Sequence, residues 1–408
     1  VKSRVMVSKI VFPEKITFDR ASESMGVADA RSMLPKEHAS ITYEVSLILP
    51  MYNVAPFLKC CLDSVFSQQD ISLQRIIIND GSTDESLAVA HDYCSSKGYA
   101  NVIIVDQKNR GLSATRNLGV SFALAEYVAY LDTDDFVSPN AYSTLYRFAL
   151  ANKLDVALCR SLVFDQRDLE FHEFYDSRIW DSLLMGNRQI FTNVWRNPDI
   201  LMLEPNANPR IVRRSLIVSR GLFYPEGLYF EDLPVHLRTL LCTESIGLLG
   251  ARHYMYRINR PGKITDQKSD IRFDILQIFD QTMRLTEEFE IPPVQGARIL
   301  YSLLRITYWC GTQTCLSDRY RFFTELGHRF SKIPEGWVER YKLRHRDEFG
   351  QMVILWALRR QDTKLLFAIS TGTRPFFKLG YYLVNQRRYG VIYRRGMLAM
   401  KHLVRIPR

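Results

Sequence analysis

Three carboxylates stand within four residues at Asp132, Asp134 and Asp135, in the segment LDTDDFVSP (131–139). Carboxylates this close repel one another, so a bound cation would stabilise them. Their hard oxygen atoms favour Mg²⁺ or Mn²⁺, ions that usually also bind the phosphates of a substrate. The segment therefore predicts a metal site for a phosphorylated ligand. The same residues would suit a solvated acidic turn before a helix that begins near Ser138.

A second acidic pair, Glu231 and Asp232, lies in the otherwise apolar and aromatic stretch GLYFEDLPV (227–235). Apolar surroundings raise the pKa of a carboxylate, and a carboxylate with a raised pKa suits a general base. The pair could instead cap the helix that follows it.

A third acidic residue, Asp80, ends an apolar run in the segment NDGSTDES (79–86). An aspartate at the end of a strand can accept hydrogen bonds from a ribose or a base edge. Ser82 and Glu85 have the spacing of a capping box for the helix that follows. An ordinary strand-to-helix turn would have the same composition.

Two basic segments could bind the phosphate oxygens of such a ligand. One is QKNRGLSATRNLG (107–119), in which a glycine permits close backbone approach, and the other is YRINRPGKIT (256–265). Surface ion pairs and a basic surface loop would look the same in sequence. The candidate residues are Arg110, Gly111, Arg116, Arg257, Arg260 and Lys263.

Short apolar runs alternate with amphipathic stretches from Val45 onward. The pattern predicts strands at 45–50, 75–80, 101–106, 126–132 and 154–159, with helices between them. This alternation predicts an α/β fold with a mostly parallel sheet flanked by helices, and the pattern from about Ile271 onward predicts a helical C-terminal region. In such sheets ligands bind beyond the carboxyl ends of the strands. The acidic and polar residues named above fall at that edge.

Five motifs, LPMYN, NDGSTD, NRGLSATRNLG, LDTDD and FED, occur in this order along residues 45–265. Their order and spacing resemble the family 2 glycosyltransferases of bacterial cell-surface polysaccharide synthesis, which have the A-type nucleotide-sugar-binding (GT-A) fold. The resemblance implies an inverting, metal-dependent transferase that uses Mn²⁺ or Mg²⁺. Such an enzyme moves a sugar from a nucleotide-sugar, with a UDP-sugar favoured, to a hydroxyl of a glycan or lipid-linked acceptor.

The resemblance also implies a role for each matching residue. Asp232 would be the general base and Glu231 its supporting acid. Asp132 and Asp134 would be the aspartate-x-aspartate pair that touches the ribose and the metal-bridged diphosphate, and the adjacent Asp135 could be the metal ligand instead. By the resemblance, the donor would be bound by Pro50, Tyr52, Asn53, Asp80, Arg116 and Asp132. The chemistry of the loops adds Gly81, Arg110, Gly111, Arg257 and Arg260 as candidate donor-binding residues.

Two further residues have open interpretations. His253 lies 21 residues after Asp232, where related folds can carry a third metal ligand, but it would also suit a structural role. Trp195 could stack against a sugar ring of the acceptor, or could be a structural tryptophan.

The predicted organisation has three parts. Residues 1–44 would be an N-terminal extension, and 45–265 the GT-A domain, with 45–159 as its nucleotide-binding half and 160–265 as its acceptor half. Residues 266–408 would be a basic helical domain.

The charge of the chain is concentrated near its C-terminus. The 408 residues carry a net charge of +10, and residues 359–408 contain twelve Lys or Arg and one acid, Asp362. A basic segment rich in aromatic residues can lie on an anionic membrane surface. We therefore expect a cytoplasmic protein that is peripheral on the inner face of the plasma membrane. A helical domain with a basic outer face, which could mediate oligomerisation, would have the same composition.

Several other classes are disfavoured. Seven cysteines without a C-x-x-C pair indicate neither a zinc site nor a disulfide framework. A dehydrogenase should have G-x-G-x-x-G after a strand, and a nucleotidyltransferase should have a glycine-rich loop after the first strand; neither is present. No nucleic-acid-binding motif accompanies the basic charge, and no apolar stretch or signal pattern predicts a membrane span or secretion. The alternative function is a non-catalytic nucleotide-sugar-binding subunit of a polysaccharide assembly complex.

Overall fold

The computed structural model describes residues 16–18, 41–97, 101–261 and 270–371. The chain divides into two compact units. The first unit contains Val1–Gln267 and Gln277–Ser302, and the second contains Lys268–Leu276 and Leu303–Arg408. The predicted boundaries at residues 44, 159 and 265 stay predictions.

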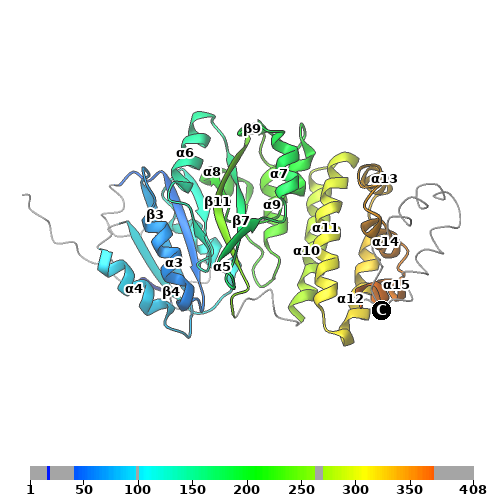
Figure 1. Cartoon of the computed structure of the whole chain (residues 1–408), viewed down its shortest axis with the longest axis horizontal. Helices are drawn as coiled ribbons and strands as arrows, with labels where there is room; N and C mark the ends of the chain where they lie inside the picture. The colour runs from blue at the N-terminus through cyan, green and yellow to red at the C-terminus, as the bar shows by residue number, and fades with distance from the viewer. Residues whose placement is uncertain (1–15, 19–40, 98–100, 262–269, 372–408) are drawn as a thin grey trace, which may run out of the picture. The chain divides into compact units, whose positions relative to one another are not determined.

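The first unit is built on one sheet of eleven strands within the described residues (Figure 1). The main order is β1-β4-β3-β2-β5-β10-β7-β11-β6, with β8 paired to β7 and β9 paired to β11. The strands are β1 (Ile16–Phe18), β2 (Val45–Met51), β3 (Leu73–Asp80), β4 (Val102–Gln107), β5 (Tyr127–Tyr130), β6 (Phe136–Val137), β7 (Val156–Asp165), β8 (Glu170–Glu173), β9 (Gln189–Thr192), β10 (Arg210–Arg213) and β11 (Ile246–Ile258).

The neighbouring pairs β1–β4, β4–β3, β3–β2 and β2–β5 are parallel, and so is the pair β7–β11. Strand β10 runs antiparallel to both of its neighbours, β5 and β7, so these two point the same way. The carboxyl ends of β2, β3, β5, β7 and β11 therefore meet at one edge of the sheet.

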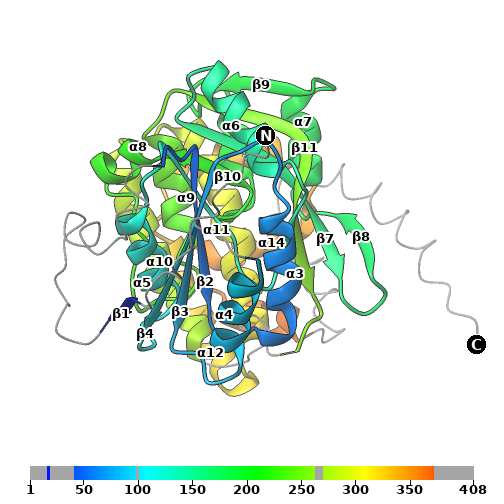
Figure 2. The same ribbon diagram turned by 90° about the vertical axis from the view of Figure 1, so that its left-hand side faces the viewer.

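Strand β2 is apolar on both sides, so both faces of the sheet must be shielded from water, and helices cover them. Val45, Leu47 and Leu49 belong to a buried core that includes the apolar side of α3. On the other face, Gly119 of α5 lies so close to Ile48 that an added Cβ would come within 2.4 Å of that side chain. Figure 2 shows α3 and α5 on opposite sides of β2. The helices of this unit include α3 (Ala55–Phe66), α4 (Ser86–Lys97), α5 (Leu112–Phe122), α6 (Ala141–Ala151), α7 (Ser177–Leu184), α8 (Arg214–Arg220) and α9 (Asp232–Leu241), with a short 3₁₀ helix, η2, at Pro198–Met202.

Strand β11 is irregular where it pairs with β7. Leu249 lies opposite Cys159 and Tyr254 lies opposite Ser161, so β11 has five residue steps where β7 has two. Such bulges bend a strand and re-aim its side chains. Beyond the bulges, pairing is regular from Tyr254 to Ile258.

The α/β class, the mostly parallel sheet and the helical C-terminal region are confirmed, and each predicted strand overlaps an observed one. The predicted capping box is wrong. Helix α4 begins at Ser86, and the Ser82 hydroxyl instead accepts a hydrogen bond of 3.1 Å from the Asn53 backbone N–H. That contact ties together the loops that follow β2 and β3.

The second unit is helical. Buried Arg319 donates to the carbonyl oxygens of Thr312, Thr314 and Ser370, which lie at or just beyond helix ends where carbonyls lack helical partners. The remaining helices are η4 (Asp270–Phe273), α12 (Leu316–Phe330), α13 (Glu335–Arg344), α14 (Phe349–Arg359) and α15 (Thr363–Ser370), while α10 (Asp274–Glu288) and α11 (Pro293–Gln313) contribute residues to both units.

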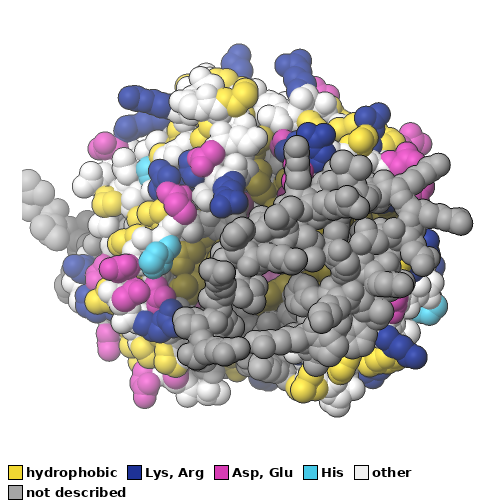
Figure 3. Space-filling model, turned by 45° about the vertical axis from the view of Figure 1, so that its right-hand side comes forward, with side chains coloured by type: hydrophobic (Ala, Val, Ile, Leu, Met, Phe, Trp, Pro, Cys, Tyr) yellow, Lys and Arg dark blue, Asp and Glu magenta, His cyan; other side chains and the backbone are white. Residues whose placement is uncertain are grey.

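On the face shown in Figure 3, Lys and Arg side chains are interspersed with Asp and Glu side chains among the described residues. None of the described helices combines the length and the apolar character needed to cross a bilayer. Most of the basic segment 359–408, from residue 372 onward, lies outside the described residues.

Candidate active site

Predicted donor-binding residues lie in the loop after β2. The Pro50 carbonyl accepts a hydrogen bond of 2.8 Å from the Thr133 hydroxyl, which joins this strand to the acidic segment. Asn53 has a left-handed backbone (φ 51°), and its side-chain oxygen accepts from the Thr83 backbone N–H at 2.8 Å. Tyr52 is 45% exposed. The loop thus presents one exposed aromatic ring on a polar framework that is tied to its neighbours.

Asp80 is buried, and its carboxylate holds the glycine-containing loop before α5. Oδ1 accepts from the Arg110 N–H at 2.8 Å, and Oδ2 accepts from the Gly111 N–H at 2.9 Å. Gly81 is left-handed (φ 69°), and an added Cβ would come within 2.7 Å of the Asn109 nitrogen. Asp80 therefore shapes this loop, while its predicted contact with a base or ribose stays a prediction.

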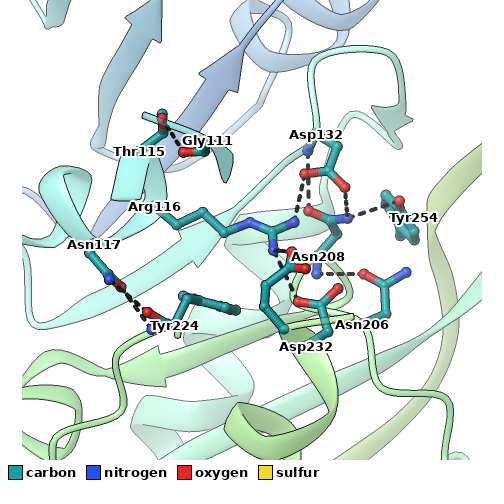
Figure 4. Close-up of polar contacts among 11 residues, drawn as sticks. Gly111, Thr115, Arg116, Asn117, Asp132, Asn206, Asn208, Tyr224, Asp232 and Tyr254 are labelled. Atoms are coloured by element: carbon teal, nitrogen blue, oxygen red, sulfur yellow. Dashed lines mark hydrogen bonds and ion pairs between the residues drawn. The ribbon is translucent and has the colours of Figure 1, made fainter. Parts of the chain in front are cut away.

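Arg116 on α5 draws three carboxylates together (Figure 4). Its side chain is 1% exposed, and it pairs with Asp132 at 2.9 Å and with Glu231 and Asp232 at 3.0 Å each. The three acids come from the loop after β5 and from the start of α9, segments about 100 residues apart in sequence. This ion pairing makes the guanidinium the centre of the acidic cluster. Its predicted contact with donor phosphates remains untested.

Glu231 and Asp232 differ in exposure. Glu231 is buried, and burial raises its pKa to about 7, with the neighbouring Asp232 charge adding to the shift. The Asp232 side chain is 29% exposed, and burial raises its pKa while Arg116 opposes that shift. Arg116 bonds Oδ1 of Asp232, and Oδ2 has no hydrogen-bond partner among the described residues. Asp232 is therefore the more exposed member of the pair, and it keeps one oxygen that no described residue bonds.

The backbone before this pair is strained. Phe230 has a φ of 66°, in the left-handed region that bulky residues rarely adopt. Such strain persists only where the surrounding structure enforces it, often at functional sites. Here it sets the entry of the chain into α9, with Glu231 at the N-cap and Asp232 as the first helical residue.

Asp132 is fixed from two sides. Arg116 bonds Oδ1, while the side-chain amide of Asn208 donates to Oδ2 at 2.9 Å and accepts from the Asp132 N–H at 3.1 Å. The same Asn208 amide donates to the Tyr254 hydroxyl at 3.0 Å, and that hydroxyl donates to Asp135. Asp135 is buried, and its second oxygen accepts from the Arg257 N–H at 2.7 Å. Both oxygens of Asp132 and of Asp135 are thus occupied by protein groups.

Asp134 is the member of the triplet with a free oxygen. Its Oδ2 pairs with Arg260, and its Oδ1 has no partner among the described residues. Mg²⁺ and Mn²⁺ usually bind one or two protein carboxylates together with substrate phosphates. The donor set therefore fits a divalent metal held mainly by Asp134.

The basic segment on β11 lies beside the triplet. Arg257 is buried, donates from Nε to the Asp134 carbonyl at 2.7 Å, and stacks over the Phe136 and Phe164 rings at 5.3 and 5.2 Å. Arg260 pairs with the Asp134 carboxylate. Lys263 lies outside the described residues. Of these cations, Arg260 is the one that a bound diphosphate could draw away from Asp134.

Three other predicted residues lie away from the carboxylate cluster or bind elsewhere. Arg110 is half-exposed and faces Glu226 at 3.4 Å. His253 Nδ1 bonds the Ser138 hydroxyl at 2.7 Å, which supports a structural role. Trp195 follows β9, which pairs with the first residues of β11, whereas the carboxylates lie near its last residues. The structure therefore does not bring Trp195 to this site.

Two residues that connect Asp132 to Asp135, Asn208 and Tyr254, were not predicted from the sequence. Asn208 stands in the run EPNANPR, where turn-forming residues give no sign of an active-site contact. Tyr254 and His253 are neighbours on a strand, so their side chains point in opposite directions. The sequence alone does not show which of the two side chains points toward Asp135.

Comparison with known proteins gives consistent matches. The model of glycosyl transferase family 2 matches residues 46–204. The uncharacterised glycosyltransferase YibD of Escherichia coli is 27% identical over 78% of this chain and 92% of its own length. The uncharacterised glycosyltransferase EpsJ of Bacillus subtilis is 31% identical over 54% of this chain, which spans 63% of EpsJ.

Solved structures show the fold. Residues 1–349 of TarS from S. aureus, in crystals with UDP and with UDP-GlcNAc, superpose with a TM-score of 0.63. The UDP complex is 16% identical and covers 81% of this chain and 91% of its own. The chain therefore contains a glycosyl transferase family 2 domain over residues 46–204, in a structure with a GT-A-type fold, and its relatives are glycosyltransferases.

Proposed function

We propose that the chain is an inverting glycosyltransferase that uses Asp232 as its general base and a divalent metal at Asp134. The observation that carries this proposal is the cluster around Arg116, which places a partly exposed carboxylate at the strand edge where ligands bind. Glu231 is buried whereas the Asp232 side chain is 29% exposed, so an acceptor hydroxyl can reach Asp232, and Glu231 supports it.

In the proposed reaction, the hydroxyl oxygen of the acceptor attacks the anomeric carbon of the donor sugar. The bond between that carbon and the diphosphate oxygen breaks as the new glycosidic bond forms, which inverts the configuration. The acceptor proton passes to Oδ2 of Asp232, the oxygen that Arg116 leaves free. The nucleoside diphosphate leaves with the electron pair of the broken bond.

The departing diphosphate needs positive charge. Arg260 stands at the site beside Asp134 and can donate to phosphate oxygens, whereas Arg257 orients the Asp134 backbone. A divalent metal bound by Asp134 would supply Lewis-acid stabilisation of the leaving group. The nucleoside pocket would be shaped by Asp80, Gly81, Gly111, Asp132 and the segment Pro50–Asn53.

A UDP-sugar is the favoured donor, because UDP and UDP-GlcNAc are the ligands named for the TarS structures that share the fold. We propose that the acceptor is a glycan or lipid-linked hydroxyl in bacterial surface polysaccharide synthesis. We also propose placement on the inner face of the plasma membrane through residues 359–408, with oligomerisation through the C-terminal helices as an alternative use of that region.

The first test is a panel of nucleotide-sugars, assayed by thermal shift and by release of the nucleoside diphosphate, with Mn²⁺, with Mg²⁺ and with excess chelator. We expect stabilisation and slow hydrolysis with one nucleotide family, both dependent on metal. Full activity in chelator would contradict the metal proposal. Nucleotide binding with no hydrolysis or transfer of any donor would instead favour the non-catalytic binding subunit.

The variant Asp232→Asn tests the base. Removing a general base costs roughly 10²–10⁴-fold in rate. We expect a loss of this size in transfer, with the dissociation constant for UDP, measured by calorimetry, nearly unchanged. Retained transfer, or loss of UDP binding in a folded variant, would refute the assignment of Asp232.

A further inference from the structure

A second arginine lies beside the proposed base, but it binds no carboxylate. Arg210 is the first residue of β10 and is 5% exposed, yet it forms no ion pair with any acid in the described part of the chain. Its Nη2 donates instead to Nδ1 of His236 at 2.8 Å. Burying a cation without a paired counter-ion costs stability, so Arg210 calls for an explanation other than stabilisation of the fold.

His236 holds this arginine in place. It is buried, and its own burial together with the Arg210 charge keeps the pKa of His236 well below its usual range. A neutral imidazole that accepts at Nδ1 must carry its proton on Nε2. Nε2 of His236 and Nε of Arg210 are both buried without a hydrogen-bond partner among the described residues. The pair thus leaves two buried N–H groups unsatisfied, which a purely structural contact would not favour.

Asp232 and His236 lie one turn apart on α9, so they share a helix face. Both line a small cavity of about 20 Å³, and Arg210 lines the same cavity from the sheet. The proposed base therefore pairs with Arg116 and lines the same cavity as Arg210 and His236.

The charges explain why a second cation would matter. Arg116 alone faces Asp132, Glu231 and Asp232, one positive charge for three acids. With a single cation, mutual repulsion would favour protonation of these acids. A further buried positive charge beside Asp232 offsets that repulsion.

We propose that Arg210 is a positioning residue for the reaction, a buried cation held by His236 that keeps the Asp232 carboxylate ionised. The proposal rests on the role of Asp232 given above and names the group that tunes it. In agreement, the Arg210 charge lowers the pKa of Asp232, against the rise that burial and Asp132 cause.

All titratable and charged groups around Asp232 bear on its ionisation. They come from α5, from β5 and the loop after it, from β10, from the segment before α9 and from α9 itself. These groups are Arg116, Tyr130, Asp132, Arg210, Tyr224, Glu231 and His236. Within this set, Arg116 and Arg210 are the cations.

The test is the dependence of kcat/KM on pH for the wild type, Arg210→Met, Arg210→Gln and Arg210→Lys, using the sugar nucleotide that the panel identifies. The base must be ionised, so activity falls as pH drops through its pKa. Losing one nearby opposite charge should move this acid limb about 1–3 pH units higher in the two neutral variants. Arg210→Lys should keep the limb close to that of the wild type. Binding of UDP alone should stay within about twofold in all variants, because Arg210 is buried and its side chain bonds His236, which is not among the proposed donor-binding residues.

Arg213→Met is the matched control, the same change at the other end of the same short strand. Arg213 pairs with Asp155 and Glu126, away from the carboxylate cluster, so its loss should leave the acid limb in place. An unmoved limb in a folded Arg210→Met or Arg210→Gln would overturn the proposal. So would an equal shift in Arg210→Lys, since packing and not charge would then be responsible.

Asp232→Asn separates this inference from the proposed function. If that variant transfers sugar normally, the base assignment fails and Arg210 has no role to tune. If it is inactive and the neutral Arg210 variants keep the wild-type profile, only the inference about Arg210 fails.

Discussion

The three aspartates of the LDTDD motif have different surroundings although they are neighbours in sequence. Asp132 is held by Arg116 and Asn208, and Asp135 is held by Tyr254 and the Arg257 backbone. Asp134 alone keeps an oxygen without a partner in the part of the chain that the structure describes. The motif thus combines one ligand-binding position with two residues that fix the loop around it.

Asp134→Asn and Asp135→Asn should therefore differ in their response to metal. Losing the main metal ligand should lower activity by about 100-fold or more and raise the Mn²⁺ concentration needed for half-maximal activity. In Asp135→Asn, the amide oxygen can still accept from the Arg257 N–H, and the hydrogen bond from the Tyr254 hydroxyl is the contact that is lost. The Mn²⁺ requirement should then change by about tenfold or less, the low end of the effect of altering an outer-shell residue. Titrating Mn²⁺ against donor hydrolysis measures both, and a larger Mn²⁺ shift in Asp135→Asn would reverse the assignment.

The sequence predicted which residues gather at the site better than it predicted their contacts. Asp132, Asp134, Glu231 and Asp232 were identified from residue type and from the order of motifs. The placement of Arg116 among three acids was not, because an arginine suits a phosphate and a carboxylate equally well. The partner is decided by the distance between α5 and α9, which no local spacing encodes.

At the scale of elements, the loop between β4 and α5 depends on Asp80 and Gly81. Asp80 accepts the N–H groups of Arg110 and Gly111, and Gly81 lies against the Asn109 backbone. The end of β3 and the loop before α5, about 30 residues later, are therefore held together by the Asp80 carboxylate and by the close packing of Gly81 on the Asn109 backbone.

Gly81→Ala should disrupt this junction. The left-handed backbone costs about 1–2 kcal/mol with a side chain, and the contact with the Asn109 nitrogen adds a clash with backbone that cannot move aside cheaply. We expect a loss of about 2 kcal/mol or more in the free energy of unfolding, together with weaker UDP binding. Urea denaturation and calorimetry would measure these two quantities.

Gly227→Ala is the matched control for that change. Gly227 has a similar φ of 75°, but an added Cβ meets nothing within 4 Å. It should show the backbone cost alone. Equal losses in the two variants would mean that the contact with Asn109 contributes nothing.

The elements themselves were predictable because their apolar pattern is local. Runs such as RIIIND could be assigned as buried strands directly, and helices of suitable length fill the gaps between them. The region after residue 160 was harder, since β8, β9 and β10 are four-residue strands without a distinct period. Strand β10 lies between β5 and β7 and runs antiparallel to both. Which strands pair, and in which direction, depends on residues far apart in the sequence, so the local apolar pattern could not predict it.

At the scale of the whole molecule, the basic C-terminal region can be tested separately from the enzyme. Residues 372–408 contain nine Lys or Arg and no Asp or Glu. Cutting before residue 359 would remove Arg359, which donates to the Phe330 and Ser331 carbonyls and pairs with Glu335. A chain ending at residue 371 leaves these contacts intact.

We expect the full chain to co-sediment with anionic vesicles at low salt and the chain ending at residue 371 to do so much less. Polybasic segments contribute roughly 1 kcal/mol per Lys or Arg near an anionic surface, and salt weakens them. Neutral vesicles provide the control. Equal binding of both chains would remove the membrane proposal, and a change in oligomeric state on truncation would favour the alternative.

The bulges in β11 make the length of that strand part of the site. Side chains alternate between the two faces of a strand, so a change of one residue reverses every side chain beyond it. The additional residues between Leu249 and Tyr254 therefore set which face carries Tyr254 and the Arg257 N–H toward Asp135. A deletion of Gly250 or Ala251 would remove no side chain that bonds the site, yet it would turn the side chains of Tyr254 and the residues after it to the opposite face of the sheet.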